Sequence, residues 1–201
     1  MADLICKLEL EDLNKSGSCV NNSSGVKVLY YALLKDISKF PTLPNTRNKF
    51  EDFSVLSEGG VTSNTLENSL QMKSGKNFFK FYCGKDLGEL KYTVQGVAGG
   101  KSLNANLEVV HPGLRKEILG FMAATMNEEL VILCKLNNGS VHMLGDKERG
   151  CEFGDTAEAT SGKAVADQNG VTINFTYDTP TAQIYVGDVD GLLADFSGSG
   201  T

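Results

Sequence analysis

The sequence predicts a mainly β protein: a β-sandwich or small barrel with one packed α-helix at about residues 113–126 and a long irregular loop at about residues 35–64. Many short stretches alternate apolar and polar residues, as half-buried strands do. The 22 glycines, together with many Asn, Ser and Thr, are typical of tight turns between strands. A hydrophobic content of 41% in 201 residues is enough for one core. We therefore expect a single domain over residues 1–201, with a flexible tail at 197–201.

The first two expected strands lie in the N-terminal part of the chain. "LICKLEL" alternates apolar and polar residues, which predicts a strand. "VKVLYYALL", residues 26–34, is β-branched and aromatic, which predicts a buried strand.

The irregular loop at residues 35–64 contains two prolines, scattered aromatic residues and a Gly-Gly pair that break any sustained period. A stretch this long without regular structure is uncommon inside a compact domain. Its apolar residues favour an arm that binds a partner, with a loop packed on its own domain and a simple linker as the alternatives. As subunit-interface residues we predict Phe40, Leu43, Phe50 and Phe53.

Four further strands are expected in the middle of the chain, at residues 65–72, 76–83, 88–97 and 101–111. In the last of these, Leu103, Ala105, Leu107 and Val109 alternate with polar residues, which predicts a strand buried on one face. A Gly-Gly pair just before it indicates a turn.

The period changes to that of a helix in "PGLRKEILGFMAATMN", residues 112–127. Pro112 suits the first helical turn, and Asn127 suits the C-terminal end. Gly120 lies in the helix interior, where we interpret it as a point of close packing against a sheet.

Asn138-Gly139 predicts a β-hairpin with a two-residue turn. Pairing outward from that turn places His142 opposite Lys135, a cation that disfavours protonation of the imidazole and metal binding. We therefore interpret His142 as structural, and His111 as a junction residue before the helix. A second pair, Asn169-Gly170, predicts another hairpin.

No residue pattern predicts a catalytic, cofactor-binding or metal-binding site. "ATSGK" lacks the spacing of a phosphate-binding loop, and no serine stands in a G-x-S-x-G motif. Asp188, Asp190 and Asp195 lack the spacing of a calcium-binding loop and read as a solvated acidic turn. The five cysteines form no C-x-x-C pair; we interpret Cys83 and Cys134 as buried free thiols of a protein folded in a reducing cytoplasm.

The formal net charge is −6 and the pI is about 5.0. A mildly acidic chain without a basic stripe is a poor candidate for gripping phosphate backbones. The N-terminal residues carry no signal-peptide pattern, and no apolar stretch has the length of a membrane helix, so we expect no membrane partner.

From Gly96 to Tyr177 the order of elements resembles that of phage virion proteins of the tail tube type, particularly those of phages that infect Bacteroidetes. The likeness rests on the "HPGLR" entry to the helix, the "NNGSVHMLGD" hairpin and the closing "ATSGKAVADQNGVTINF" segment. It covers roughly the C-terminal half of the chain, and its motifs are structural.

The resemblance implies a non-enzymatic virion subunit that self-assembles into stacked hexameric rings, assembled in the host cytoplasm and located in the phage tail. Its partners would be other copies of itself, other virion tail proteins, and DNA that passes through the channel without specific binding. The alternatives are another virion role, such as a head–tail connector or capsid decoration, then a carbohydrate-binding β-sandwich, and last an unrecognised hydrolase.

Overall fold

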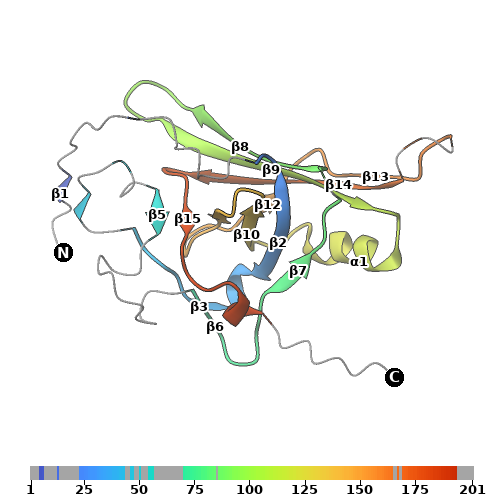
Figure 1. Ribbon diagram of the computed structural model, residues 1–201, viewed down its shortest axis with the longest axis horizontal. Coiled ribbons are helices and arrows are strands. Elements are labelled where there is room, and N and C mark those ends of the chain that lie inside the picture. The colour runs from blue at the N-terminus through green and yellow to red at the C-terminus, as the bar shows by residue number, and fades with distance from the viewer. Residues whose placement is uncertain are drawn as a thin grey trace.

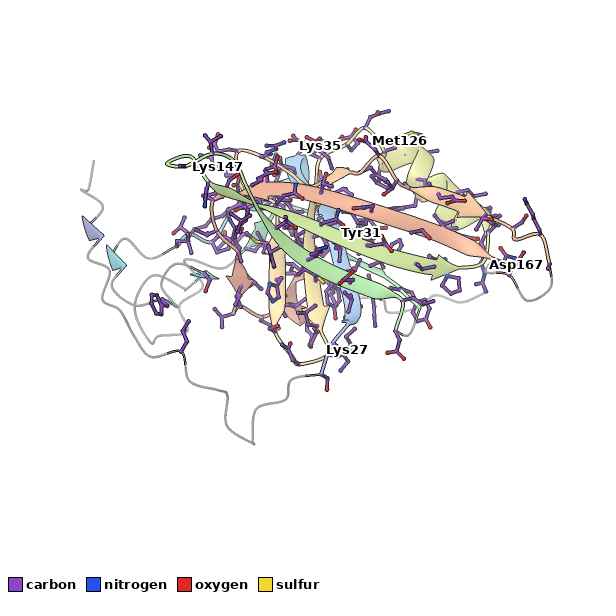
Figure 2. The ribbon with its side chains drawn as sticks, turned by 90° about the horizontal axis from the view of Figure 1, so that it is seen from above. Lys27, Tyr31, Lys35, Met126, Lys147 and Asp167 are labelled. Atoms are coloured by element: carbon purple, nitrogen blue, oxygen red, sulfur yellow. The ribbon has the colours of Figure 1, made fainter. Side chains whose placement is uncertain are left out.

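The fold is mainly β, with two facing sheets and one α-helix (Figure 1). The computed structural model describes residues 5–6, 13, 23–43, 46–47, 50, 54–56, 70–84, 86–164, 167 and 169–193. Among the described strands neither sheet closes on itself, so the predicted sandwich, and not the predicted barrel, is what the chain forms. The strands of one sheet cross steeply over those of the other (Figure 2).

One sheet has six described strands, with β10 at its centre. In spatial order they are β5 (Val55–Leu56), β15 (Ile184–Tyr185), β11 (Val141–Leu144), β10 (Leu130–Leu136), β2 (Val26–Leu33) and β7 (Phe79–Phe81). The first five residues of β10 are all buried, because this sheet is covered on both faces. Their sequence, "LVILC", therefore shows no alternation of apolar and polar residues.

The facing sheet is built on one long antiparallel ladder between β9 and β14. Its strands in spatial order are β12 (Glu152–Phe153), β14 (Gly170–Thr179), β9 (Ser102–Pro112) and β8 (Gly88–Gln95), with β13 (Glu158–Thr160) also paired to β14. The strand expected at 101–111 is confirmed with its predicted inward face, because Ala105, Leu107 and Val109 are fully buried.

Short pairs complete the described structure. They are the parallel pair β1 (Ile5–Cys6) with β4 (Thr46–Arg47), and the antiparallel pair β3 (Ile37–Lys39) with β6 (Gln71–Met72). Two 3-10 turns lie at Leu34–Asp36 and Asp190–Leu192. The described residues of 35–64 therefore include three short strands, so this segment is less irregular than its sequence indicates.

Two apolar clusters lie on opposite faces of the six-stranded sheet. The first fills the space between the sheets and includes Leu107, Ile132 and Phe175. The second includes Val131 and Leu133 of β10 and Tyr185 of β15, and it is completed by residues outside the two sheets: Ile37, Leu70 and Phe78. The molecule therefore has three layers, with the six-stranded sheet in the middle.

The predicted helix is confirmed as α1 (Lys116–Thr125), but it begins later than expected. Pro112 is the last residue of β9, not the first of the helix, because Gly113 takes a φ of 81° and interrupts the chain direction. Ile118 and Phe121 pack into the first cluster, where the Phe121 ring lies 5.0 Å from that of Tyr31. The interpretation of Gly120 was wrong, since a Cβ built there would meet nothing within 4 Å.

Both Asn-Gly predictions need correction. The first hairpin has a three-residue loop, because Leu136 N–H bonds Ser140 O at 2.9 Å and Gly139 N–H bonds Leu136 O at 3.1 Å. Gly139, with a φ of 98°, occupies the left-handed position that ends such a loop. In the second hairpin Gly170 is not in the turn at all; it begins β14, opposite Pro112.

Candidate functional site

The outer face of the five-stranded sheet carries many polar side chains from three neighbouring strands. Alternation along β8, β9 and β14 sends every second residue away from the core. The outward residues are Glu89, Lys91, Thr93 and Gln95 of β8, Ser102, Asn104, Asn106 and Glu108 of β9, and Thr172, Asn174, Thr176 and Asp178 of β14. None of these residues is apolar; the same register also places Val110 of β9, which is buried, on this side of the sheet opposite Thr172.

Carboxylates outnumber cations on this face. Glu89 lies directly opposite Glu108, and Lys91 lies opposite Asn106. By register, Glu152 and Glu158 join the same face from β12 and β13, opposite Thr176 and Thr172. Neither Glu89 nor Glu108 forms an ion pair with any described residue.

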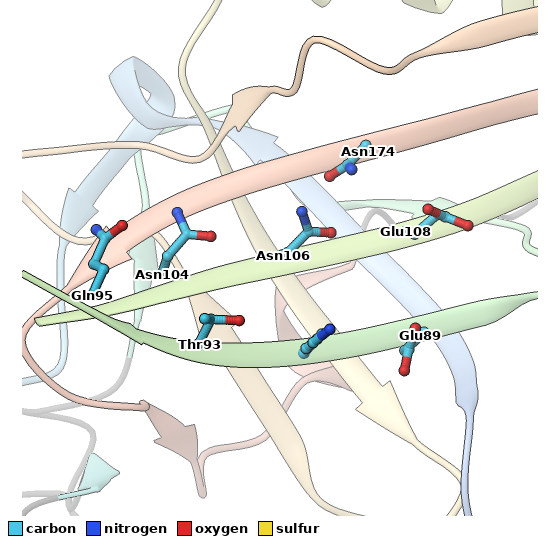
Figure 3. A pocket seen from close by; sticks show the side chains of 8 residues that line it. Glu89, Thr93, Gln95, Asn104, Asn106, Glu108 and Asn174 are labelled. Atoms are coloured by element: carbon cyan, nitrogen blue, oxygen red, sulfur yellow. The ribbon is translucent and has the colours of Figure 1, made fainter.

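A shallow groove of about 350 Å³ runs along the face (Figure 3). Its lining consists of amide, hydroxyl and carboxylate side chains with one amine, Lys91. Aromatic rings, on which nucleic-acid bases or sugars stack, are absent from this lining. The groove can therefore hold water or form hydrogen bonds with a polar surface. It lacks the cluster of Lys and Arg side chains that binding a polyanion requires.

Asp178 ties the three strands together at one end of the face. It accepts hydrogen bonds from Gln95 of β8 at 2.7 Å and Asn104 of β9 at 2.8 Å, and Arg149 pairs with it at 3.4 Å. The hydrogen bond from Asn104, aided by Gln95 and Arg149 and opposed by burial, holds the pKa of the Asp178 carboxyl below its ordinary value. Side chains from three strands therefore meet at this end of the face, and the Asp178 carboxylate stays charged at neutral pH.

β8 is an open edge of this sheet, since it pairs with β9 and with no other described strand. Val110 N–H bonds Leu87 O at 3.0 Å, which fixes the phase of the ladder. In an antiparallel ladder the hydrogen-bonding direction alternates from residue to residue. It follows that the amide and carbonyl groups of Leu90, Tyr92 and Val94 point away from β9, toward the open edge.

The opposite edge of the sheet is formed by two short strands, β12 and β13, both paired to β14. The two edges differ in length and sequence, so they are not interchangeable surfaces. A strand that joined β8 would extend the sheet in one direction only.

His142 lies inside the sandwich and not beside Lys135 as the sequence analysis expects. The three-residue loop shifts the register by one, so His142 stands opposite Cys134 and shares its inward face. Its Nδ1 lies 3.0 Å from the hydroxyl of Tyr92 on β8, and its Nε2 lies 3.3 Å from Ser140 Oγ. Burial lowers the pKa of His142, so protonation is disfavoured by desolvation and not by a lysine.

The described residues form no metal-binding cluster of three or more His, Cys, Asp or Glu side chains. Asp188 accepts a hydrogen bond from the Asp190 amide, which fits the predicted acidic turn; Asp195 lies outside the described residues. Cys83 and Cys134 are buried and free as predicted, and so is Cys151.

The predicted interface residues fall partly within the described chain. Phe40 and Leu43 are half-buried against the second apolar cluster of their own domain. Phe50 is also half-buried, and Phe53 lies outside the described residues. Phe40 and Leu43 therefore make the contacts expected of a loop that packs on its own domain. Their role in binding a partner stays a prediction.

Comparison with known proteins gives no relative: no protein-family model, curated protein or solved structure matches this chain. Within the described residues, no helix has the length and apolar character needed to cross a membrane. Neither the carboxylate-rich face nor the open edge was predicted from the sequence. The Glu, Asn and Thr residues that alternate through "SLNANLEVVH" and "GELKYTVQ" were the available signal.

Proposed function

We propose that this chain is a structural subunit that assembles with copies of itself through the open edge of β8. The observation that carries the proposal is that this open edge borders a mainly polar, carboxylate-rich sheet face. Backbone donors and acceptors of Leu90, Tyr92 and Val94, which pair with no strand in the described part of the chain, form a template for another strand. Sheet extension would then join the polar faces of successive copies into one surface.

The two unlike edges of the sheet favour head-to-tail contacts. Such contacts close into rings when the rotation between copies divides a full turn, and form filaments otherwise. A strand added at β8 from the β12–β13 edge of the next copy repeats the same contact at every step. This contact therefore builds a ring or a filament, whereas antiparallel pairing of two β8 edges would give a two-fold dimer.

The specific form that we propose is a phage tail tube protein, non-enzymatic, in stacked hexameric rings within the virion. The polar faces of the sheets would line the channel, with Glu89, Glu108 and Asp178 exposed to the passing DNA. Phosphate binding requires Lys and Arg contacts that release counterions, and this face supplies Lys91 and little else. Such a lining would let DNA pass without holding it, and other tail proteins would bind at the ends.

The test is to block the edge without disturbing the fold. Val94→Pro removes one outward amide, at a position where the β8–β9 ladder does not use it and where the side chain is 63% exposed. Val94→Ala is the matched control, because it keeps the amide. We expect rings or tubes in electron micrographs and fast-sedimenting species for the wild type and Val94→Ala, and their loss in Val94→Pro with an unchanged circular dichroism spectrum.

The proposal fails if the wild-type protein sediments as a strict monomer at high concentration and shows no rings. Circular assemblies that do not stack would instead favour the connector role, and binding to preformed capsids would favour decoration.

The groove favours one candidate of a different class, a carbohydrate-binding β-sandwich. Its amide and carboxylate side chains, such as Asn104, Asn106 and Glu108, are groups that hydrogen-bond sugar hydroxyls. A reproducible hit on a glycan array that is lost in Asn106→Ala would support this candidate over the structural subunit.

A further inference from the structure

β7 lies at one end of the six-stranded sheet and has an outer edge of its own. It pairs with β2 on one side, and no other described strand pairs with it. The side chain of Phe79 is 56% exposed, and Lys80 is exposed and forms no ion pair with a described residue. An edge with these properties can receive a further strand.

The backbone of β7 shows which of its groups point to that edge. Phe78 N–H, one residue before β7, bonds Leu192 O at 3.0 Å, and Leu192 is not part of β2. Because backbone groups alternate in direction along a strand, the amide and carbonyl of Lys80 point to the same outer side. Those of Phe79 and Phe81 point to β2, with which they are paired.

The C-terminal end of the described chain already occupies the start of this edge. Leu193 forms a parallel bridge with Phe78, directly after the 3-10 turn Asp190–Leu192 (Figure 1). Its φ of −79° and ψ of 148° are those of an extended chain, and its own N–H bonds Asp190 O at 3.2 Å, away from β7. Leu193 also packs against the second apolar cluster. The chain therefore leaves the turn extended and parallel to β7.

The sequence that follows Leu193 suits the rest of the edge. Residues 194–201 lie beyond the described residues. Continued from the bridge, the parallel register makes three neighbouring pairs: Phe79 with Ala194, Lys80 with Asp195, and Phe81 with Phe196. The second pair has opposite charges, and Phe196 falls on the same side of the sheet as the exposed ring of Phe79. After Phe196 the sequence is Ser-Gly-Ser-Gly-Thr, whose glycines are typical of the end of a strand.

We propose that residues 194–196 add a parallel strand to the outer edge of β7, so that the C-terminal segment of the chain covers this edge. In this strand Lys80 N–H donates to Ala194 O, and Lys80 O accepts from Phe196 N–H. The occupant is the chain's own segment and not that of a second copy. Leu193 is already bridged to Phe78, so no connecting loop has to be closed before the strand can form.

The consequence for assembly rests on the proposed function. With its outer edge covered, β7 does not compete with β8 for the strands of other copies. A chain that ends at Leu193 would keep both edges open. We expect such a chain to form irregular aggregates in place of rings.

Amide hydrogen exchange, measured by NMR, tests the added strand. The measurement is made on Val94→Pro, in which the assembly edge of β8 is blocked, and on the same variant shortened to end at Leu193. We expect the Lys80 amide to be protected in the full-length chain and to lose that protection in the shortened one. The amides of Phe79 and Phe81, which point to β2, should stay protected in both and thereby show that the shortened chain is folded.

Asp195→Lys tests the register within a full-length chain. It sets a second cation beside Lys80, so the protection of the Lys80 amide should fall while that of Phe79 stays unchanged. Ser199→Lys is the matched control, because it adds a lysine beyond the proposed strand and should leave Lys80 protected. Lys80→Glu combined with Asp195→Lys restores the opposite charges, and it should restore protection at position 80. If the shortened chain does not fold, these variants decide the proposal.

The proposal is overturned if the Lys80 amide exchanges equally fast in the full-length and shortened chains, or if Ser199→Lys acts as strongly as Asp195→Lys. A mixture of isotope-labelled shortened chain and unlabelled full-length chain tests the other occupant. Protection of Lys80 in the labelled chain would assign the edge to the segment of a second copy and would also overturn the proposal. Absence of rings in the wild type counts against the proposed function, whereas the exchange of Lys80 in Val94→Pro still decides the added strand.

Discussion

Gly170 offers a sharp test of how tightly β9 and β14 are paired. A Cβ built on Gly170 would lie 2.6 Å from the carbonyl oxygen of His111, a backbone atom of the neighbouring strand. A flexible side chain could turn away from such a contact, whereas a backbone oxygen in a ladder cannot. Gly170→Ala should therefore force the two strands apart at the start of the ladder.

Two opposing effects set the size of the change. Forced overpacking costs about 1–3 kcal/mol, and replacing Gly by Ala returns about 0.4–1 kcal/mol by restricting the unfolded chain. The net expectation is a loss of about 1–2 kcal/mol in the free energy of unfolding. In a chain of this size each kcal/mol shifts Tm by about 2–4 °C, so Tm should fall by about 2–8 °C.

Gly120 is the matched control, since the same substitution should act in the opposite direction. It lies exposed in the interior of α1, and a Cβ there meets nothing within 4 Å. Gly120→Ala should stabilise the protein by about 0.8–1 kcal/mol through helix propensity. Its Tm should rise by about 2–4 °C.

Both variants are compared with the wild type by urea denaturation and by thermal melts followed by circular dichroism. The reasoning is refuted if Gly170→Ala is as stable as the wild type, which would mean that the ladder accommodates a methyl group without cost. A destabilised Gly120→Ala would refute the placement of that glycine on the exposed face of α1.

Three further outcomes follow from the structure. Leu107→Ala, at a fully buried position between the sheets, should cost about 2–5 kcal/mol in urea denaturation; a loss under 1 kcal/mol would contradict that burial. Burial raises the pKa of the Cys134 and Cys151 thiols, so a thiol reagent should reach them only after denaturant is added, and fast labelling of the native protein would argue against their placement. Converting Glu89 and Glu108 to Lys should turn the polar face into a DNA-binding surface whose affinity falls steeply with salt, measured by gel shift; equal binding by the wild type would exclude a non-adhesive face.

Local patterns predicted the strands well but failed at their junctions. The alternation in β9 identified its buried face correctly. "HPGLR" was assigned to the helix because Pro favours a first helical turn, yet Pro112 can equally end a strand when a glycine of positive φ follows it. The same residues fit both the start of a helix and the end of a strand. The pairing of β9 with β14, which extends to Pro112, decides for the strand.

The hairpin of β10 and β11 illustrates a second limit. An Asn-Gly pair suits a two-residue turn, but Asn137-Asn138-Gly139 also suits a type I turn followed by a left-handed glycine. The difference of one residue moves His142 from the vicinity of Lys135 to the interior. The residues of the turn do not decide between the two-residue and the three-residue loop. The register is decided by burial, because Cys134 and Met143 are buried on opposite faces of the six-stranded sheet.

The candidate site was the least predictable part. Alternation along β8 predicts which of its residues face water. The position of β8 at the edge of the sheet depends instead on how strands distant in the sequence pair with one another. Such non-local pairing has no signature in a short window of sequence.

The strand order of the six-stranded sheet also governs how the chain can fold during synthesis. β2 is made early, yet its partner on one side is β10, with Leu33 paired to Leu130, and its partner on the other side is β7. The apolar residues of β2 must therefore wait, uncovered, until most of the chain has left the ribosome. Long-range pairing of this kind slows folding and exposes aggregation-prone surface in the meantime. We expect the nascent chain to depend on chaperones until β10 is complete. Formation of the six-stranded sheet would then be the step that limits the yield of native protein.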